Sequence, residues 1–134
     1  MTEEEAERFV RLFEAAWNDA DGPGFAPLWH EGGLLHAPHF ARAIAGREQP
    51  ALRAFWRQAA PDMVWRLVDW TFRGERVCIL WESDNRVGDK IITLRGVDWL
   101  TLRDGKIAEE RVYYDATPLR AAISGETPAP LLAF

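Results

Sequence analysis

Two carboxylate residues in the second half of the chain, Asp98 and Glu110, are the first candidates for chemistry. Asp98 falls in a segment with the alternation of a β-strand, where alternate positions such as Leu100 are apolar. A carboxyl group on an apolar strand face loses hydration. Its pKa then rises, and it can act as a general acid or neutral hydrogen-bond donor near pH 7. Glu110 could pair with it and serve as base. The alternatives are a salt bridge of Asp98 with Arg111 or Arg66, and a solvated strand end for Glu110.

The histidines provide the other candidate acid–base groups. His36 and His39 lie in the apolar segment of residues 34–40, and either could serve as base or acid. Their spacing of three places them on opposite faces of an ideal strand, so at most one is expected to face inward. The alternative for both is hydrogen bonding or solvent exposure. His30 is expected to end a helix and to interact with the helix dipole.

Motifs for metals, other nucleophiles and cofactors are missing from the sequence. There is no H-x-H, C-x-x-C or H-E-x-x-H spacing, no G-x-S-x-G motif, and no phosphate- or dinucleotide-binding glycine loop. The single Cys78 has no basic cluster beside it and is expected to be an ordinary buried thiol. We therefore expect no metal and no cofactor.

The composition excludes several classes of function. A chain of 134 residues suits one domain, and 48% hydrophobic with 28% charged residues is typical of a globular protein. The net charge of −5, without any basic run, argues against a nucleic-acid partner. The N-terminus is acidic and no apolar stretch is long enough to span a membrane. With one cysteine and hence no internal disulfide, these features predict a soluble cytoplasmic protein.

Three helices are predicted in the N-terminal half. Thr2 and Glu5 can form a capping box, and apolar residues then recur at three- and four-residue spacing as far as Ala20. Residues 25–29 predict a short second helix, ended by the Gly-Gly pair that follows. A third helix is expected over residues 48–59, with a glycine before it and a proline near its start.

The second half predicts a β-meander, preceded by a short strand or arm at residues 34–40. Alternating apolar and polar positions give strands at 63–72, 76–85, 90–102 and 106–115, and Asp104-Gly105 is a strong hairpin signal. Prolines and a glycine then predict a loosely ordered tail over residues 119–134. The apolar end of this tail, Leu131–Phe134, either frays or covers a neighbouring surface. A single α+β domain over residues 1–118 is therefore expected.

The order of these elements resembles the nuclear-transport-factor-two-like superfamily, which includes the SnoaL-like polyketide cyclases, ketosteroid isomerase and limonene epoxide hydrolase. The resemblance covers roughly residues 5–118 and rests on the order and spacing of short segments. These are Trp17-Asn18-Asp19-Ala20, His36-Ala37-Pro38, Ala45-Gly46-Arg47-Glu48, Phe55-Trp56, Pro61-Asp62, and Asp104-Gly105-Lys106-Ile107 through Tyr113-Tyr114-Asp115.

This resemblance implies a cone-shaped, cystatin-like α+β fold, with three N-terminal helices packed in a curved antiparallel sheet of four or five strands. It implies a pocket for a small molecule inside the cone, and a homodimer through the outer sheet face. The fold does not fix the function, because this scaffold carries many chemistries and many proteins that only bind.

Ketosteroid isomerase is the most informative comparison. It uses an aspartate base and an oxyanion hole made of a tyrosine and a protonated aspartate. The resemblance places Ala37 at the base, Phe13 at the tyrosine and Asp98 at the protonated aspartate, so a steroid isomerase of that mechanism is not expected. The functional aspartate of the final strand in the epoxide hydrolase and the cyclases is replaced here by Val112. Asp115, three residues further on, is expected on the other strand face.

If Asp98 faces the cone as the resemblance implies, period-two alternation assigns the rest of the sheet. The inward positions would be Ile92, Leu94, Gly96, Leu100 and Leu102, followed on the last strand by Ala108, Glu110, Val112 and Tyr114. The outer positions would include Arg95, Trp99, Arg111 and Tyr113. The seven tryptophans and seven phenylalanines suit either a core or a pocket wall. The expected wall residues are Phe13, Trp17, Ala37, Phe55, Trp56, Leu100, Val112 and Tyr114.

The leading hypothesis is a small enzyme that performs cofactor-independent acid–base chemistry on a mostly apolar small molecule. The reaction would be an isomerisation, a cyclisation, a dehydration or an epoxide opening, with Asp98 as acid or oxyanion donor and Glu110, His36 or His39 as base. The rival hypothesis is a non-catalytic binding or accessory domain. A third is a scaffold that works mainly in dimerisation.

Overall fold

The computed structural model describes residues 1–126. The helices are α1 (Glu3–Asn18), α2 (Gln49–Ala59) and α3 (Thr117–Ser124), and the 3-10 turns are η1 (Ala26–Leu28) and η2 (Gly46–Glu48). The strands are β1 (Trp29–His36), β2 (Ile44–Ala45), β3 (Val64–Arg73), β4 (Arg76–Val87), β5 (Lys90–Arg103) and β6 (Lys106–Tyr114). The apolar end of the predicted tail, Leu131–Phe134, lies outside the described residues.

The strands form one sheet in the order β2-β1-β6-β5-β4-β3. Strands β3 to β6 are the predicted antiparallel meander. Its last turn has positive φ at both Asp104 (50°) and Gly105 (72°), as a tight hairpin of this hand requires. Strand β1 pairs in parallel with β6, and β2 adds a two-residue edge strand to β1. The sheet thus has six strands where the sequence predicts four or five, and one pair is parallel.

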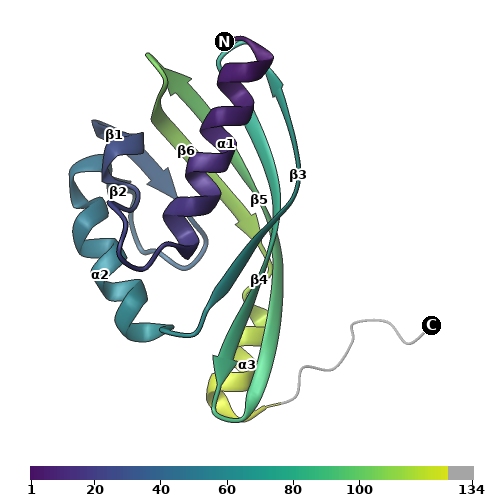
Figure 1. Ribbon diagram of the computed structural model, residues 1–134. Helices are drawn as coiled ribbons and strands as arrows, with labels where there is room; N and C mark the ends of the chain where they lie inside the picture. Colours follow the sequence, from purple (N-terminus) through teal and green to yellow (C-terminus); the bar gives the residue numbers. More distant parts are fainter. Residues whose placement is uncertain (127–134) are drawn as a thin grey trace.

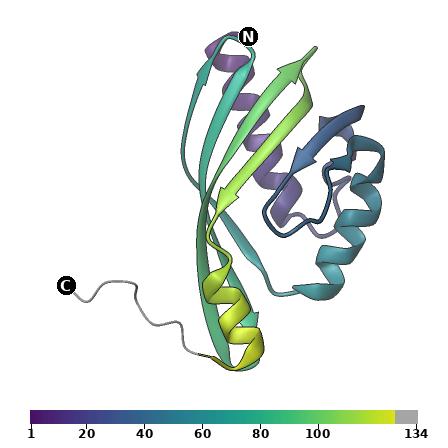
Figure 2. The same cartoon turned by 180° about the vertical axis from the view of Figure 1, so that it is seen from behind.

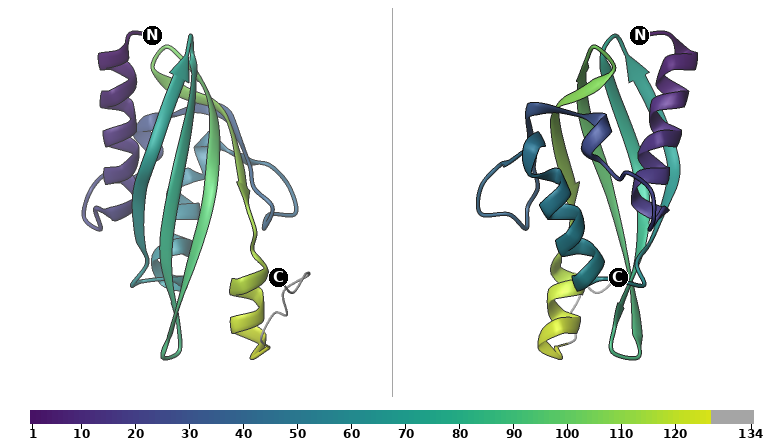
Figure 3. Two further views of the ribbon diagram at one scale, coloured as in Figure 1. Left: turned by 90° about the vertical axis from the view of Figure 1, so that its right-hand side faces the viewer. Right: turned by 60° about the vertical axis from the view of Figure 1, so that its left-hand side comes forward.

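The sheet curves around the first two helices (Figures 1 and 2). Register shifts between Leu67 and Asp69 in β3, and between Ile107 and Glu109 in β6, mark bulges that increase the bend of the strands. Helices α1 and α2 lie on the concave side, and α3 packs against β5 and β4 near the end of their hairpin (Figure 3). This arrangement confirms the predicted α+β fold with a curved sheet.

Helix α1 is fixed at both ends by side chains. The Thr2 hydroxyl accepts from the Glu5 backbone N–H at 3.2 Å and the Glu5 carboxylate accepts from the Thr2 N–H at 2.7 Å, which is the predicted capping box. At the other end, the Asn18 side-chain amide donates to the Trp65 carbonyl at 2.8 Å and accepts from the Trp65 N–H at 3.1 Å. This pair of hydrogen bonds holds the end of α1 against β3. The buried face of the helix consists of Ala6, Phe9, Val10, Phe13 and Ala16.

Two local predictions are wrong around residues 25–36. The second helix is only the 3-10 turn η1, and the Gly-Gly pair lies inside β1 instead of ending a helix. At Gly33 a Cβ would lie 2.6 Å from the Ile107 carbonyl oxygen, so the glycine permits close approach of β1 to β6. His30 therefore lies on a strand, where its Nε2 is 2.6 Å from the Arg103 carbonyl oxygen.

The segment after β6 also differs from the prediction, because residues 117–124 form α3 where a loosely ordered tail is expected. Pro118 occupies the first turn, where no backbone N–H is needed, and the Asp115 carboxylate accepts from the Thr117 N–H at 2.9 Å. Gly125, with φ of 75°, ends the helix. A short helix with strong end signals is easily missed when the prolines in and after it are taken as signs of disorder.

Candidate active site

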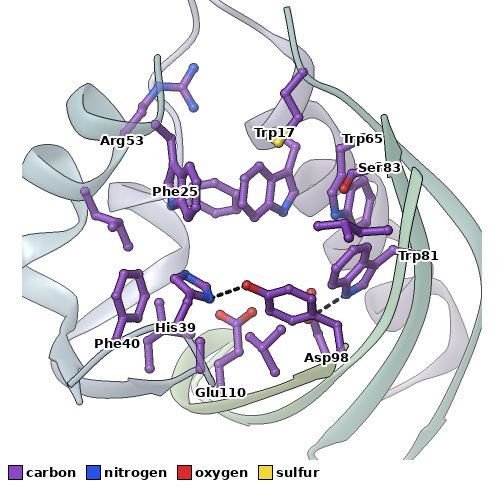
Figure 4. Close-up of a pocket in the computed structure, with 18 of the residues that line it drawn as sticks. Trp17, Phe25, His39, Phe40, Arg53, Trp65, Trp81, Ser83, Asp98 and Glu110 are labelled. Atoms are coloured by element: carbon purple, nitrogen blue, oxygen red, sulfur yellow. Dashed lines mark hydrogen bonds between the residues drawn. The ribbon is translucent and has the colours of Figure 1, made fainter. Parts of the chain in front are cut away.

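A cavity of about 100 Å³ lies between the concave face of the sheet and helices α1 and α2 (Figure 4). That volume is several times what one buried water molecule needs. The rings of Trp17 and Trp65, which both line it, stack nearly parallel on each other, with centroids 6.1 Å apart and planes inclined by 10°. Its aromatic lining residues are Phe13, Trp17, Phe25, Trp29, Phe40, Trp56, Trp65, Trp81 and Tyr114.

Asp98 lies inside this cavity, on the inward face of β5. Its side chain is almost completely buried, and the indole N–H of Trp81 donates a hydrogen bond of 2.8 Å to its Oδ1 (Figure 4). Burial removes the carboxylate from water and raises the pKa of Asp98 to about 7, although the hydrogen bond from Trp81 acts in the opposite direction. The burial pattern of β5 follows the predicted alternation, with Leu94, Gly96, Leu100 and Leu102 buried on the same face.

Glu110 is the second carboxyl group of the cavity. The β5–β6 register places Val112 opposite Asp98, so Glu110 is the diagonal neighbour of Asp98 on the same face, at about 7–8 Å between Cα atoms. Burial, and then the negative charge of Asp98, raise the pKa of Glu110 well above its ordinary value. Within residues 1–126 no protein group forms a hydrogen bond with its carboxyl oxygens.

The two carboxyl groups differ in one respect that decides which of them keeps a proton. Trp81 donates to Asp98 and so stabilises the charged form of Asp98, whereas Glu110 receives no such donor from the described residues. Two neighbouring buried carboxyl groups do not both ionise readily near neutral pH. The geometry therefore favours a carboxylate on Asp98 and a protonated carboxyl on Glu110.

Only one of the two candidate histidines reaches the cavity. His39 lines it, and its Nδ1 is hydrogen bonded to the Tyr114 hydroxyl at 2.6 Å (Figure 4). Burial lowers the pKa of His39 and raises the pKa of Tyr114, so both are neutral near pH 7. His36 is on the other side of β1, where its Nε2 is 3.6 Å from Glu109 Oε1. The predicted strand over residues 34–40 is wrong at its end, because β1 stops at His36 and His39 lies in the loop that follows.

Most of the sequence matches a family model. The model of the SnoaL-like domain covers residues 9–110, which is most of the chain. This chain belongs to the SnoaL-like domain family. No curated protein sequence matches it.

Solved structures with the same fold share little sequence with this SnoaL-like domain. A proposed SnoaL-like polyketide cyclase from Jannaschia sp. CCS1 is 22% identical with a TM-score of 0.77, and 92% of this chain and 94% of that chain are covered. AclR, a proposed hydroxylase from Streptomyces galilaeus, is 16% identical with a TM-score of 0.79, covering 97% and 87%. A ketosteroid isomerase-like protein from Catenulispora acidiphila, in complex with trimethylamine, is 18% identical with a TM-score of 0.77, covering 89% and 93%. These likenesses show the fold.

The three positions compared with ketosteroid isomerase all meet in the cavity of this SnoaL-like domain. Phe13 comes from α1, Ala37 follows β1, and Asp98 lies on β5. Val112, at the position of the final-strand aspartate, also lines the cavity, whereas Asp115 is exposed beyond the end of β6. Phe13, Ala37 and Val112 therefore give the site apolar side chains where the resemblance implies polar groups, and Asp98 and Glu110 are the acidic residues that line it.

Most of the predicted wall residues line the cavity, with two exceptions. Phe55 is 55% exposed, because the face of α2 toward the cavity carries Leu52 and Trp56, and the helical rotation turns Phe55 away from it. Leu100 is fully buried in the core and does not line the cavity. The predicted inward residue Ala108 is the extra residue of the bulge in β6, so Ile107 fills the core instead. The residues that do line it as predicted are Phe13, Trp17, Ala37, Trp56, Val112 and Tyr114.

Several polar residues of the cavity escaped the sequence analysis. Gln49, Ser83 and Asn85 line it together with the tryptophans Trp29 and Trp81. The alternation of β4 could have placed Ser83 and Asn85 on the inward face with Trp81, since all three are buried at every second position. Gln49 gave no signal, because a glutamine at a helix start is ordinarily exposed.

Residues 1–126 contain neither a cluster of metal ligands nor a candidate membrane-spanning helix. No three side chains of His, Cys, Asp or Glu gather closely enough to hold a metal ion. No helix there has the length and the apolar character that crossing a membrane would need.

Gly96 supports the Trp81–Asp98 hydrogen bond, because it lies opposite Trp81 in the pairing of β4 with β5. A Cβ at Gly96 would lie 2.3 Å from Cζ2 of the Trp81 ring, which is itself held by Asp98 and packs near Trp65 and Tyr114. We expect Gly96→Ala to destabilise the protein by about 1–3 kcal/mol and to weaken the Trp81–Asp98 hydrogen bond. Urea unfolding and the indole N–H chemical shift of Trp81 measure the two effects. An unchanged shift would contradict the second.

Proposed function

We propose that this SnoaL-like domain is a cofactor-independent enzyme that performs acid–base chemistry on a mostly apolar small molecule in the cavity. The observation that carries the proposal is the pair of buried carboxyl groups, Asp98 and Glu110, of which only Asp98 receives a hydrogen bond from the described residues. Enzymes separate acid and base roles by giving two titratable groups different surroundings. Here the aromatic walls supply the low-dielectric surroundings of both carboxyl groups. The Trp81 hydrogen bond to Asp98 makes the surroundings of Asp98 different from those of Glu110.

The proton transfers follow from this distribution. Glu110 donates its proton to an oxygen of the substrate, while the Asp98 carboxylate accepts a proton from an acidic C–H or from an attacking water. After the step Glu110 is the carboxylate and Asp98 is protonated, and the original state returns by proton exchange when product leaves. Isomerisation, cyclisation, dehydration and epoxide opening all combine these two transfers. The roles of the pair are thus opposite to those expected from the sequence. His39, neutral and bonded to Tyr114, is a secondary candidate for the base.

Exchange of acidic C–H protons tests the proposal without knowledge of the natural substrate. α-Tetralone, a bicyclic ketone, would be incubated with the protein in D₂O and its α-CH signal followed by NMR. We expect the protein to accelerate exchange, and Asp98→Asn or Glu110→Gln to lower the rate by about 100-fold or more. Glu109→Gln is the matched control, because Glu109 is the neighbouring carboxylate on the outer face. Equal rates in all four proteins would count against catalysis by the pair.

The second candidate function is a small-ligand-binding or accessory domain without catalysis. It is favoured by the apolar residues Phe13, Ala37 and Val112, which line the cavity where the resemblance to ketosteroid isomerase and limonene epoxide hydrolase implies polar groups. Under this alternative, α-tetralone raises the thermal stability of the protein but its α-protons exchange no faster than in buffer.

A homodimer through the outer sheet face belongs to the same proposal. Leu80, Trp99 and Tyr113 are exposed on neighbouring strands, where Trp99 pairs with Arg111 and Tyr113 with Val97. Exposed aromatic residues on a sheet face are typical of protein interfaces. Sedimentation velocity measures the oligomeric state directly. A cytoplasmic location stays a prediction from the sequence.

A further inference from the structure

Three N–H donors of the cavity have no acceptor. Among the described residues, the buried side-chain polar atoms without a hydrogen-bond partner are Nε1 of Trp17, Nε1 of Trp29 and Nε2 of Gln49. All three residues line the same cavity as Asp98 and Glu110. A buried donor without an acceptor is uncommon in proteins, since its desolvation is not compensated. Three such donors around one cavity indicate an acceptor that comes with the ligand.

Gln49 is the most informative of the three. The residue is 3% exposed, and within residues 1–126 the Nε2 of its amide forms no hydrogen bond with another protein group. The backbone just before Gln49 is held in place by contacts of Gly46 and Glu48. Gly46 packs against the His30 carbonyl of β1, and Glu48 accepts from the Ala45 N–H at 2.8 Å and from the Arg42 guanidinium. The start of α2 is thus fixed against β1 at the point where Gln49 lines the cavity.

Trp29 is fixed in a similar way on β1. It is 4% exposed, and its ring lies against Gly33, where a Cβ would be 3.1 Å from Cε3 of the indole. The ring therefore has little freedom to turn its N–H toward another partner. Trp29 and Gln49 come from β1 and α2, whereas Asp98 and Trp81 come from β5 and β4. The unpaired donors and the Asp98–Trp81 pair thus belong to different walls of the cavity.

We propose that Gln49 and Trp29, assisted by Trp17, form a second polar subsite that binds an oxygen acceptor of the ligand, such as a ketone or quinone carbonyl. The subsite makes Gln49 a specificity-determining residue. It rests on the proposed small-molecule function of the cavity, and it deepens that function by requiring a ligand that carries an acceptor oxygen for these donors. α-Tetralone has a single oxygen, so its carbonyl reaches the subsite and the Glu110 carboxyl in separate binding orientations. Hydrocarbons of the same shape bind less well, because they leave the donors unpaired.

The test compares α-tetralone with tetralin, the hydrocarbon that lacks its carbonyl, by quenching of tryptophan fluorescence. We expect the full chain to bind α-tetralone at least tenfold more tightly than tetralin. Gln49→Leu should reduce this ratio at least fivefold while leaving tetralin affinity the same or higher. Gln58→Leu, on the exposed face of the same helix, is the control and should keep the ratio. No preference in the wild type, including no binding of either compound, or an undiminished ratio in Gln49→Leu, overturns the subsite.

Two further measurements keep this test independent of folding defects and of the proposed function. Gln49→Leu replaces an unpaired buried amide with an apolar side chain, so the ligand-free variant should unfold at a higher temperature than the wild type. A lower unfolding temperature would show that the amide has a structural role and would overturn the proposal. Asp98→Asn should abolish exchange of α-tetralone protons but retain the preference over tetralin. The rate of exchange reports on the catalytic proposal and the affinity ratio reports on the subsite. Failure of one proposal can therefore be distinguished from failure of the other.

Discussion

Replacement of Asp98 by Asn is expected to stabilise the protein at pH 8 by about 4 kcal/mol. The pKa of Asp98 is raised from 3.8 to about 7 in the folded protein, and each pH unit between these values corresponds to about 1.4 kcal/mol. The unfolded chain releases this proton near pH 4 and the folded protein only near pH 7. The contribution of the protonated carboxyl to the free energy of unfolding is therefore complete below about pH 4 and is lost as the pH rises to about 7. Asparagine carries no charge, so the free energy of unfolding of the variant does not fall in this way as the pH rises.

The measurement is the free energy of unfolding in urea between pH 4 and pH 8, for wild type and Asp98→Asn. We expect the difference between the two proteins to be small at pH 4 and to grow steadily toward pH 8. Carboxylates whose pKa is lowered, such as Glu48, also lose their stabilising contribution in acid. This loss is the same in both proteins, so it cancels when their free energies of unfolding are subtracted. Asp69→Asn, at an exposed position on β3, is the control. A variant that is less stable than the wild type at pH 8 would show that the Asp98 charge is well compensated in the folded state.

This expected gain has a functional meaning. A buried carboxylate that costs stability is retained only where it serves another purpose, and groups with strongly shifted pKa values concentrate at functional sites. The same substitution should therefore increase stability and remove α-proton exchange. An opposite pair of outcomes, lost stability with unchanged exchange, would indicate a structural carboxylate.

Replacement of Gly46 by Ala is expected to have the largest destabilising effect, about 3 kcal/mol. A Cβ at this position would lie 1.8 Å from the His30 carbonyl oxygen and 2.9 Å from the His30 carbonyl carbon. Both atoms belong to the backbone of β1, so no side-chain rotation relieves the contact and η2 must move away from the strand. Because η2 leads directly into α2, the displacement should also move Gln49 and weaken the preference for α-tetralone.

Gly32 offers a matched control in β1 itself. A Cβ there meets no atom within 4 Å, and its φ is not in the left-handed region, so Gly32→Ala should be neutral or slightly stabilising. Urea unfolding of the two variants measures the difference. Similar stabilities would mean that η2 can separate from β1 at little cost, which would contradict the rigid placement of Gln49.

The predictable part of this protein is the part governed by local periodicity. The meander strands, the capping box of α1 and the hairpin at Asp104-Gly105 each depend on residues close in sequence. The alternation along β5 was sufficient to assign Leu94 and Leu100 to the side of Asp98. Where the chain departs from strict alternation the prediction fails, as at the bulge that turns Ile107 rather than Ala108 into the core.

The parallel pairing of β1 with β6 is a different kind of failure. These strands are about 75 residues apart in sequence, and Leu35 meets Glu110 only in the folded sheet. The Gly-Gly pair in β1 looks like the end of a helix when considered alone. Only the presence of the Ile107 carbonyl at 2.6 Å from a Cβ position explains why Gly33 is required.

The periodicity of the sequence by itself determined the meander strands and the residues that share a face with Asp98 and with Glu110, because strand periodicity is a local property of the chain. The curved architecture and the inward direction of these faces were predicted from the resemblance to the nuclear-transport-factor-two-like superfamily. Only the tertiary structure decided how these carboxylates differ, since the Trp81 N–H that reaches Asp98 comes from a neighbouring strand. It also decided that His39 and not His36 lines the cavity, and that Gln49 is buried without a partner. Hydrogen bonding and desolvation depend on which distant segments meet, and they are what sets the proton affinity and the ligand preference of the site.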